Sequence, residues 1–201
     1  MRYIENLLPL LSNASSLNEL SRVITVLSPG AEKRIEEEDL ELKHSFSATK
    51  CMAHGLVMTD LMLQEYAHRN PGTAFLNIFP GWVKTNMTSE LASPLKQIVR
   101  AFLTVLLTIA PGATDIDESG ERSLYCATSA AYQPASGGAG VPLQFGVAVA
   151  KIERDGVYLL NQKGELTGNR AILEEYSKKG LGTKIWEHTL EVFERVEISV
   201  R

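Results

Sequence analysis

The sequence predicts an α/β fold in which a short parallel sheet packs between helices. Residues 23–27 and 74–79 are β-branched or apolar runs, and each is followed closely by a proline–glycine turn, as buried strands of a parallel sheet are. Residues 47–69 lie between the runs and have apolar side chains at helical spacing. Strand, helix and strand of these lengths form a right-handed βαβ unit, so we expect parallel strands.

The segments near the N-terminus extend this unit. Helical spacing begins at residue 2 but is interrupted by Pro9 and by the polar residues 12–16, which predicts a helix and then a loop. The strand at 23–27 is expected to be buried on both faces. Residues 31–43 are acidic and polar, so they are interpreted as an exposed excursion.

The rest of the chain adds helices and one more strand around the same sheet. Helices are predicted at about 94–110, 117–131, 170–178 and 183–196, and a strand at 157–160. No internal repeat and no domain boundary is visible, so residues 1–201 are interpreted as a single domain.

Composition and charge exclude several classes of partner. A net charge of −4, with no run of lysine and arginine interleaved with aromatics, argues against nucleic acid and membrane surfaces. The most apolar stretch, 101–110, is shorter than the roughly 20 residues that span a bilayer. Cys51 and Cys126 are too few for a disulfide framework, so we expect a reduced, cytoplasmic location. The four histidines have no metal-ligand spacing, so no metal site is predicted.

Three landmarks occur in a characteristic order. Residues 22–28 end in Ser28, residues 46–50 (Phe-Ser-Ala-Thr-Lys) lead the long helix, and residues 80–85 (Pro-Gly-Trp-Val-Lys-Thr) follow the next strand. In this order they resemble the short-chain dehydrogenase/reductase family, which has a strand ending in serine, a Tyr-x-x-x-Lys helix and a Pro-Gly-x-Val-x-Thr segment.

The likeness extends to residues 70–71, 156–158 and 184–189, which resemble a branch of this family common in filamentous fungi. Many members of that branch act in secondary-metabolite pathways. The chain matches only the later half or two thirds of a full-length member. The resemblance therefore implies a partial Rossmann-like three-layer fold that lacks the N-terminal half with the dinucleotide-phosphate site.

The resemblance implies that the protein is an NAD- or NADP-dependent oxidoreductase that acts on a hydroxyl or ketone of a hydrophobic small molecule. In such enzymes the serine orients the substrate oxygen, and the lysine lowers the tyrosine pKa and holds the ribose. Ser28 and Lys50 take these roles by order, although Ser28 also fits a turn residue and Lys50 a solvated helix lysine. The resemblance assigns cofactor contacts to Lys50, Pro80, Gly81, Val83 and Thr85.

Two departures leave enzymatic activity undecided. Phe46 stands where the family has its catalytic tyrosine, and a phenyl ring has no proton to give. No glycine-rich strand-to-helix turn precedes residue 23, and the glycines at 137–140 come too late in the chain to replace it. The alternative function is a non-redox or inactive relative that binds or isomerises a pathway intermediate. A start assigned too late in the gene is a third interpretation.

The same resemblance bears on assembly. The first helix and the helix at 47–69 look like those that family members use for subunit pairing. The strand at 23–27 would have an open edge, and open edges invite association. We therefore expect a homo-oligomer or a marginally stable monomer.

Overall fold

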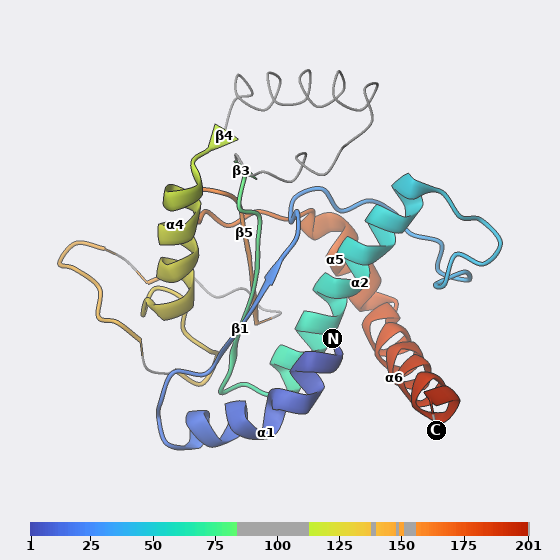
Figure 1. Ribbon diagram of the computed structural model, residues 1–201, viewed down its shortest axis with the longest axis horizontal. Coiled ribbons are helices and arrows are strands. Elements are labelled where there is room, and N and C mark those ends of the chain that lie inside the picture. The colour runs from blue at the N-terminus through green and yellow to red at the C-terminus, as the bar shows by residue number, and fades with distance from the viewer. Residues whose placement is uncertain (84–112, 138–139, 148, 151–155, 201) are drawn as a thin grey trace.

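The computed structural model describes residues 1–83, 113–137, 140–147, 149–150 and 156–200 (Figure 1). The predicted helix at 94–110 and Thr85 lie outside the described residues. The helices are α1 (Arg2–Ser16), α2 (Ala48–Arg69), α4 (Ile116–Thr128), α5 (Arg170–Lys178) and α6 (Leu181–Val200). The strands are β1 (Arg22–Val26), β2 (Ala74–Ile78), β3 (Trp82–Val83), β4 (Ala113–Thr114) and β5 (Val157–Leu160).

The main sheet has three parallel strands in the order β1-β2-β5. Arg22 of β1 is in register with Ala74 of β2, and Phe75 of β2 is in register with Val157 of β5. This confirms the predicted short parallel sheet and the βαβ unit. A second pairing, between the two-residue strands β3 and β4, was not predicted from the sequence.

Side chains of β2 alternate between two hydrophobic cores, which makes the fold a three-layer one. Phe75 packs with α2, α5 and α6 on one face, whereas Leu76 and Ile78 pack with the end of α4 on the other (Figure 1). Tyr66 of α2 and Tyr158 of β5 are almost fully buried, one in each core. Each large apolar side chain buried in this way contributes roughly 1.5–3 kcal/mol. The predicted α/β three-layer class is confirmed.

Helix α1 differs from its prediction, because it continues through Pro9 and the polar residues 12–16 instead of ending in a loop. One side of the helix is held against α2. Ile4 is buried, and Glu5 accepts a 2.6 Å hydrogen bond from the Tyr66 hydroxyl. Packing of this side therefore outweighs the helix-breaking preference of the local sequence.

Strand β1 also differs, because the expected burial on both faces is wrong. It lies at an edge of the sheet, none of its five residues is fully buried, and Val26 is 58% exposed. The following residue, Leu27, is exposed as well. Among the described residues, β1 pairs only with β2, so one edge remains accessible, while Val23 and Ile24 each pack partly against one of the two cores.

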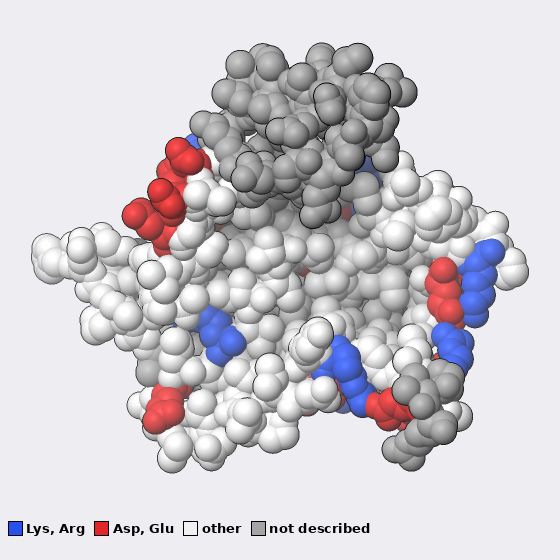
Figure 2. Space-filling view, in the orientation of Figure 1, with Lys and Arg blue, Asp and Glu red and all other residues white. Residues whose placement is uncertain are grey.

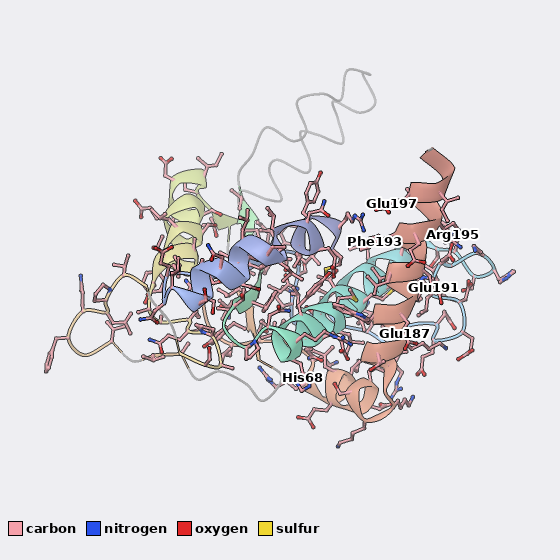
Figure 3. All side chains as sticks on the ribbon, turned by 90° about the horizontal axis from the view of Figure 1, so that it is seen from below. His68, Glu187, Glu191, Phe193, Arg195 and Glu197 are labelled. Carbon is pink, nitrogen blue, oxygen red and sulfur yellow. The ribbon has the colours of Figure 1, made fainter. Side chains whose placement is uncertain are left out.

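The C-terminal elements agree closely with the sequence prediction. Strand β5 and helix α5 have the predicted bounds, whereas α6 extends a few residues further at both ends. Phe193, Arg195 and Glu197 lie on the last turns of α6 (Figure 3). Arg195 pairs with Glu41 at 3.1 Å, and Glu197 pairs with Arg2, which fixes this end of α6 to both α1 and the 31–43 excursion. No helix in the described part of the chain is long and apolar enough to cross a bilayer.

Candidate functional site

The carboxyl ends of β1, β2 and β5 meet at one edge of the sheet, which is where open α/β sheets bind ligands. Two cavities open beside this edge. The Ser28 groove, of about 290 Å³, is lined by Leu27, Ser28, Ala31, Lys33, Thr49, Met52, Ala53, Gly55 and Leu56. The α4 cavity, of about 250 Å³, is lined by Ile78, Phe79, Pro80, Ser119, Glu121, Arg122, Ser123, Tyr125, Cys126, Tyr132, Asn161, Gln162, Lys163 and Gly164.

The Ser28 groove combines one hydroxyl with apolar walls. Ser28 follows the end of β1 and is exposed, while its carbonyl accepts the Ala31 N–H at 3.1 Å in a turn. Met52 and Leu56 form part of the wall from α2. Both interpretations of Ser28 are therefore compatible with the structure: it is a turn residue, and its side chain is available at the groove.

Phe46 lies just before α2 and is 72% exposed. Ser47 begins the helix, and its hydroxyl accepts the Lys50 backbone N–H at 3.2 Å. The neighbouring Ser45 donates its hydroxyl to Asp39 at 3.1 Å. Since the phenyl ring carries no exchangeable proton, Phe46 itself cannot serve as the acid that a tyrosine would provide.

Lys50 is engaged by the acidic excursion. Its ammonium is 2.7 Å from a carboxylate oxygen of Glu36, and both side chains are about half exposed. The Glu36 backbone N–H donates to Nε2 of His54 at 2.9 Å. His54 is buried, and burial lowers its pKa, which favours the neutral imidazole that accepts this hydrogen bond. Lys50 lines neither of the two cavities.

The segment after β2 lies at the same edge of the sheet but beside the other cavity. Pro80 lines the α4 cavity. Gly81 is buried and has a φ of +83°, a left-handed conformation that favours glycine. Val83 belongs to β3 and is partly buried. Of the predicted residues that the structure describes, Ser28 and Pro80 lie at this edge but in different cavities, and Lys50 lines neither cavity.

The α4 cavity contains residues that the sequence reasoning did not single out. Tyr125 and Tyr132 meet edge to face with ring centroids 6.2 Å apart, and Arg122 donates to the Gln162 carbonyl at 2.6 Å. Burial raises the pKa of both the Tyr132 hydroxyl and the Cys126 thiol, so both groups are protonated near neutral pH. The sequence predicted a helix here, but which of its faces lines a cavity depends on packing against β2.

A nicotinamide dinucleotide needs polar contacts at its nicotinamide end and free backbone N–H groups for its pyrophosphate. Ser28 offers a hydroxyl of the first kind at its groove, whereas Gly81 is buried and lines neither cavity. The glycine-bearing connections into α2 and α5 do not offer the second, because Glu32 accepts the N–H groups of Gly30 at 2.8 Å and Asn169 at 2.6 Å. Among the described residues, Ser28 is thus available to the nicotinamide end, whereas these two connections have their backbone N–H groups occupied by Glu32. The described residues contain no histidine, cysteine or carboxylate cluster able to hold a metal.

Comparison with known proteins finds fungal oxidoreductases. An oxidoreductase of Emericella nidulans is 37% identical over 196 residues, which cover 94% of this chain and 57% of that protein. The oxidoreductase andH of Emericella variicolor is 32% identical over 98% of this chain and 58% of its own length. The NmrA-like family domain-containing oxidoreductase notO of an Aspergillus species is 30% identical, over 96% and 54% respectively. The chain thus spans a little over half the length of these relatives.

Other comparisons contribute less. No protein-family model matches the chain. A crystal structure of NADPH-bound carbonyl reductase from chicken fatty liver aligns with 82% of this chain and 50% of its own, with 18% identity and a TM-score of 0.43. That likeness is too distant to support an argument, so the α/β assignment depends on the observed strand order and parallel pairing.

Proposed function

We propose that this chain provides the substrate-binding part of an oxidoreductase of the short-chain dehydrogenase/reductase type, with NADP or NAD as cofactor. The observation that carries the proposal is the similarity of at least 94% of the chain to proteins named as fungal oxidoreductases. A parallel sheet with Ser28 and Pro80 at its carboxyl edge supports it further. The substrate is a hydrophobic small molecule with a hydroxyl or ketone.

The residues of the Ser28 groove suit such a substrate. The hydroxyl of Ser28 can donate to a ketone or accept from an alcohol. Met52 and Leu56 provide apolar walls, so the rest of the molecule would leave water on binding. A bound nicotinamide would exchange a hydride with the substrate carbon. The chain itself would orient the substrate oxygen and exclude water from the apolar part.

We further place the substrate among the intermediates of a fungal secondary-metabolite pathway. The relatives from Emericella and Aspergillus support a fungal setting, and the pathway follows from the sequence resemblance alone. A reducing, cytoplasmic compartment is proposed because Cys51 and Cys126 are both free thiols.

A second candidate function is a non-redox relative that binds or isomerises such an intermediate. Three features favour it. Phe46 supplies no acid. Lys50 is paired with Glu36, and Glu32 accepts the backbone N–H groups of Gly30 and Asn169. This relative would use the Ser28 groove without a cofactor.

Titration with NADPH and NADH separates the two functions. We would follow nucleotide fluorescence and thermal shift on the wild-type chain and on Phe46→Tyr, and then assay hydride transfer to ketones. Saturable micromolar binding, with hydride transfer gained by Phe46→Tyr and lost again in Phe46→Tyr/Ser28→Ala, supports the oxidoreductase. A folded protein that binds neither nucleotide supports the second function instead.

A further inference from the structure

We propose that Glu36 acts as a latch on Lys50: its carboxylate holds the lysine ammonium away from the Ser28 groove and so keeps the protein in a state of low affinity for its cofactor. The inference rests on the proposed function and on the ribose contact that the family resemblance implies for Lys50. It adds a regulatory contact to that same site.

The Lys50 side chain lies outside the Ser28 groove. Thr49 and Met52 line the groove, whereas Lys50, about 100° further around the helix than Thr49, does not. Its ammonium is instead 2.7 Å from Glu36. The side chain of Lys50 is 41% exposed, so it has room to adopt another rotamer once this contact is broken.

Hydrogen bonds of the backbone at residues 35 and 36 hold Glu36 in place. Its N–H donates to His54 Nε2 at 2.9 Å, and the preceding N–H, of Ile35, donates to the Tyr176 hydroxyl at 3.0 Å. Ile35 is only 8% exposed and packs in the main core. The Glu36 carbonyl accepts the Asp39 N–H at 3.1 Å, so the backbone is held on both sides of the side chain and does not follow Lys50 toward the groove.

Separate ion pairs attach the rest of the 31–43 excursion to the C-terminal helices. Arg34 makes two contacts with Glu175, at 2.9 and 2.6 Å. Glu37 pairs with Lys179 and Glu38 with Lys184, each at 2.9 Å. Neither of these two glutamates contacts Lys50, so Glu38 provides a control that removes the same charge from the same segment.

A half-exposed ion pair of this kind alters an equilibrium by about two- to five-fold. The rate at which the Lys50 amine is acetylated measures how strongly Glu36 holds it, and the measurement needs no cofactor. We would treat the folded protein with N-hydroxysuccinimidyl acetate and follow Lys50 by peptide mass spectrometry, with Lys33 as internal reference. Lys50 should be acetylated about two to five times faster in Glu36→Gln than in wild type. In Glu38→Gln the acetylation rate of Lys50 should be that of the wild type. An equal rate in wild type and Glu36→Gln, with both proteins folded by circular dichroism, refutes the latch.

Nucleotide titration then tests its regulatory meaning. NADPH should bind about two to five times more tightly to Glu36→Gln than to wild type or to Glu38→Gln. The gain should disappear when Lys50→Met is added. If it persists there, the effect is a general loss of negative charge and the latch is wrong. If no variant binds NADPH although Glu36→Gln accelerates acetylation, the contact exists but the cofactor role of Lys50 is refuted, and the proposed function and the regulation both fail.

Discussion

The side-chain amide of Asn77 in β2 donates a 2.7 Å hydrogen bond to Asp60 in α2, and both side chains are completely buried. The contact joins the central strand to the helix that leads away from the candidate site. A buried carboxylate is costly unless hydrogen bonds compensate it, so this pair fixes how α2 lies on the sheet.

Replacement of Asn77 by alanine should therefore be strongly destabilising. It removes a donor from a buried carboxylate and leaves a small void, so we expect a loss of about 2–4 kcal/mol in the free energy of unfolding. Urea denaturation followed by circular dichroism measures it. The double variant Asn77→Leu/Asp60→Leu should recover part of the loss, because it removes both polar groups. A single variant within 0.5 kcal/mol of wild type, a rough bound for surface changes, would contradict this account.

Arg22 should be a second stabilising residue. From the start of β1 its guanidinium donates to the backbone carbonyls of Cys126 at 2.7 Å, Ser129 at 3.0 Å and Tyr132. Arg22→Met leaves these acceptors without their donor, so thermal and urea unfolding should show a loss of about 2–3 kcal/mol. Arg34→Met, which breaks an exposed pair, is the matched control and should cost much less. Equal losses in both variants would refute a special role of Arg22.

His54 should make stability depend on pH. Burial lowers its pKa in the folded state, so below the unfolded value of about 6.5 the unfolded chain binds the additional proton. Stability should be fully present above that pH and fall as the pH decreases toward the folded pKa. His54→Gln can still accept the Glu36 N–H without titrating, so its urea midpoint should change less between pH 7 and pH 5.

The control for this experiment is His68→Gln. His68 is an exposed histidine at the C-terminal end of the same helix (Figure 3). It should keep the pH dependence of the wild type. If His54→Gln and wild type lose stability in parallel, other groups account for the dependence.

How far the sequence predicts this molecule differs from one element to the next. The bounds of β5 were predicted correctly because its four apolar residues are buried and are followed by a polar turn. The burial of β1 was predicted wrongly, because a strand at the edge of a sheet has the same β-branched pattern as a central one. Strand order is a property of the whole fold.

The candidate site shows the same limit. Ser28 and Pro80 were expected together, and both do lie at the carboxyl edge, since that follows from their positions just after parallel strands. Their separation into two cavities depends on where α4 packs. The acidic excursion was interpreted as solvated, yet Glu36 binds Lys50 and Glu32 is buried. Which carboxylates of residues 31–43 form ion pairs or hydrogen bonds depends on the path that this segment takes in the folded protein.

Self-association remains a proposal, and the accessible surface of α1 supports it. Tyr3, Leu7 and Leu10 are 84%, 49% and 67% exposed at helical spacing, and the charged residues of α1, Arg2 and Glu5, lie in its first turn. Few charged side chains lie over α1 in Figure 2, whereas acidic ones gather over the start of α4. Exposed apolar patches of this kind mark interaction surfaces.

Light scattering coupled to size exclusion should therefore show a dimer or larger species for wild type. Leu7→Glu and Leu10→Lys should each shift the protein toward monomer, because a charge would be buried in the interface. A control change on another surface, Glu121→Lys, should have no effect on assembly. A wild-type monomer at all concentrations would reject self-association.

Gly81 should tolerate alanine poorly because of its backbone conformation. Its φ of +83° is a conformation that residues with a Cβ atom rarely adopt, so Gly81→Ala should destabilise the protein by about 1 kcal/mol or more. Gly120→Ala is the opposing control, since that glycine is exposed within α4 and an added Cβ meets nothing within 4 Å. Alanine there should stabilise by up to about 1 kcal/mol, because it improves helix propensity. Urea unfolding of both variants should thus move the midpoint in opposite directions, and a shared direction would show that the left-handed turn after β2 does not constrain this residue.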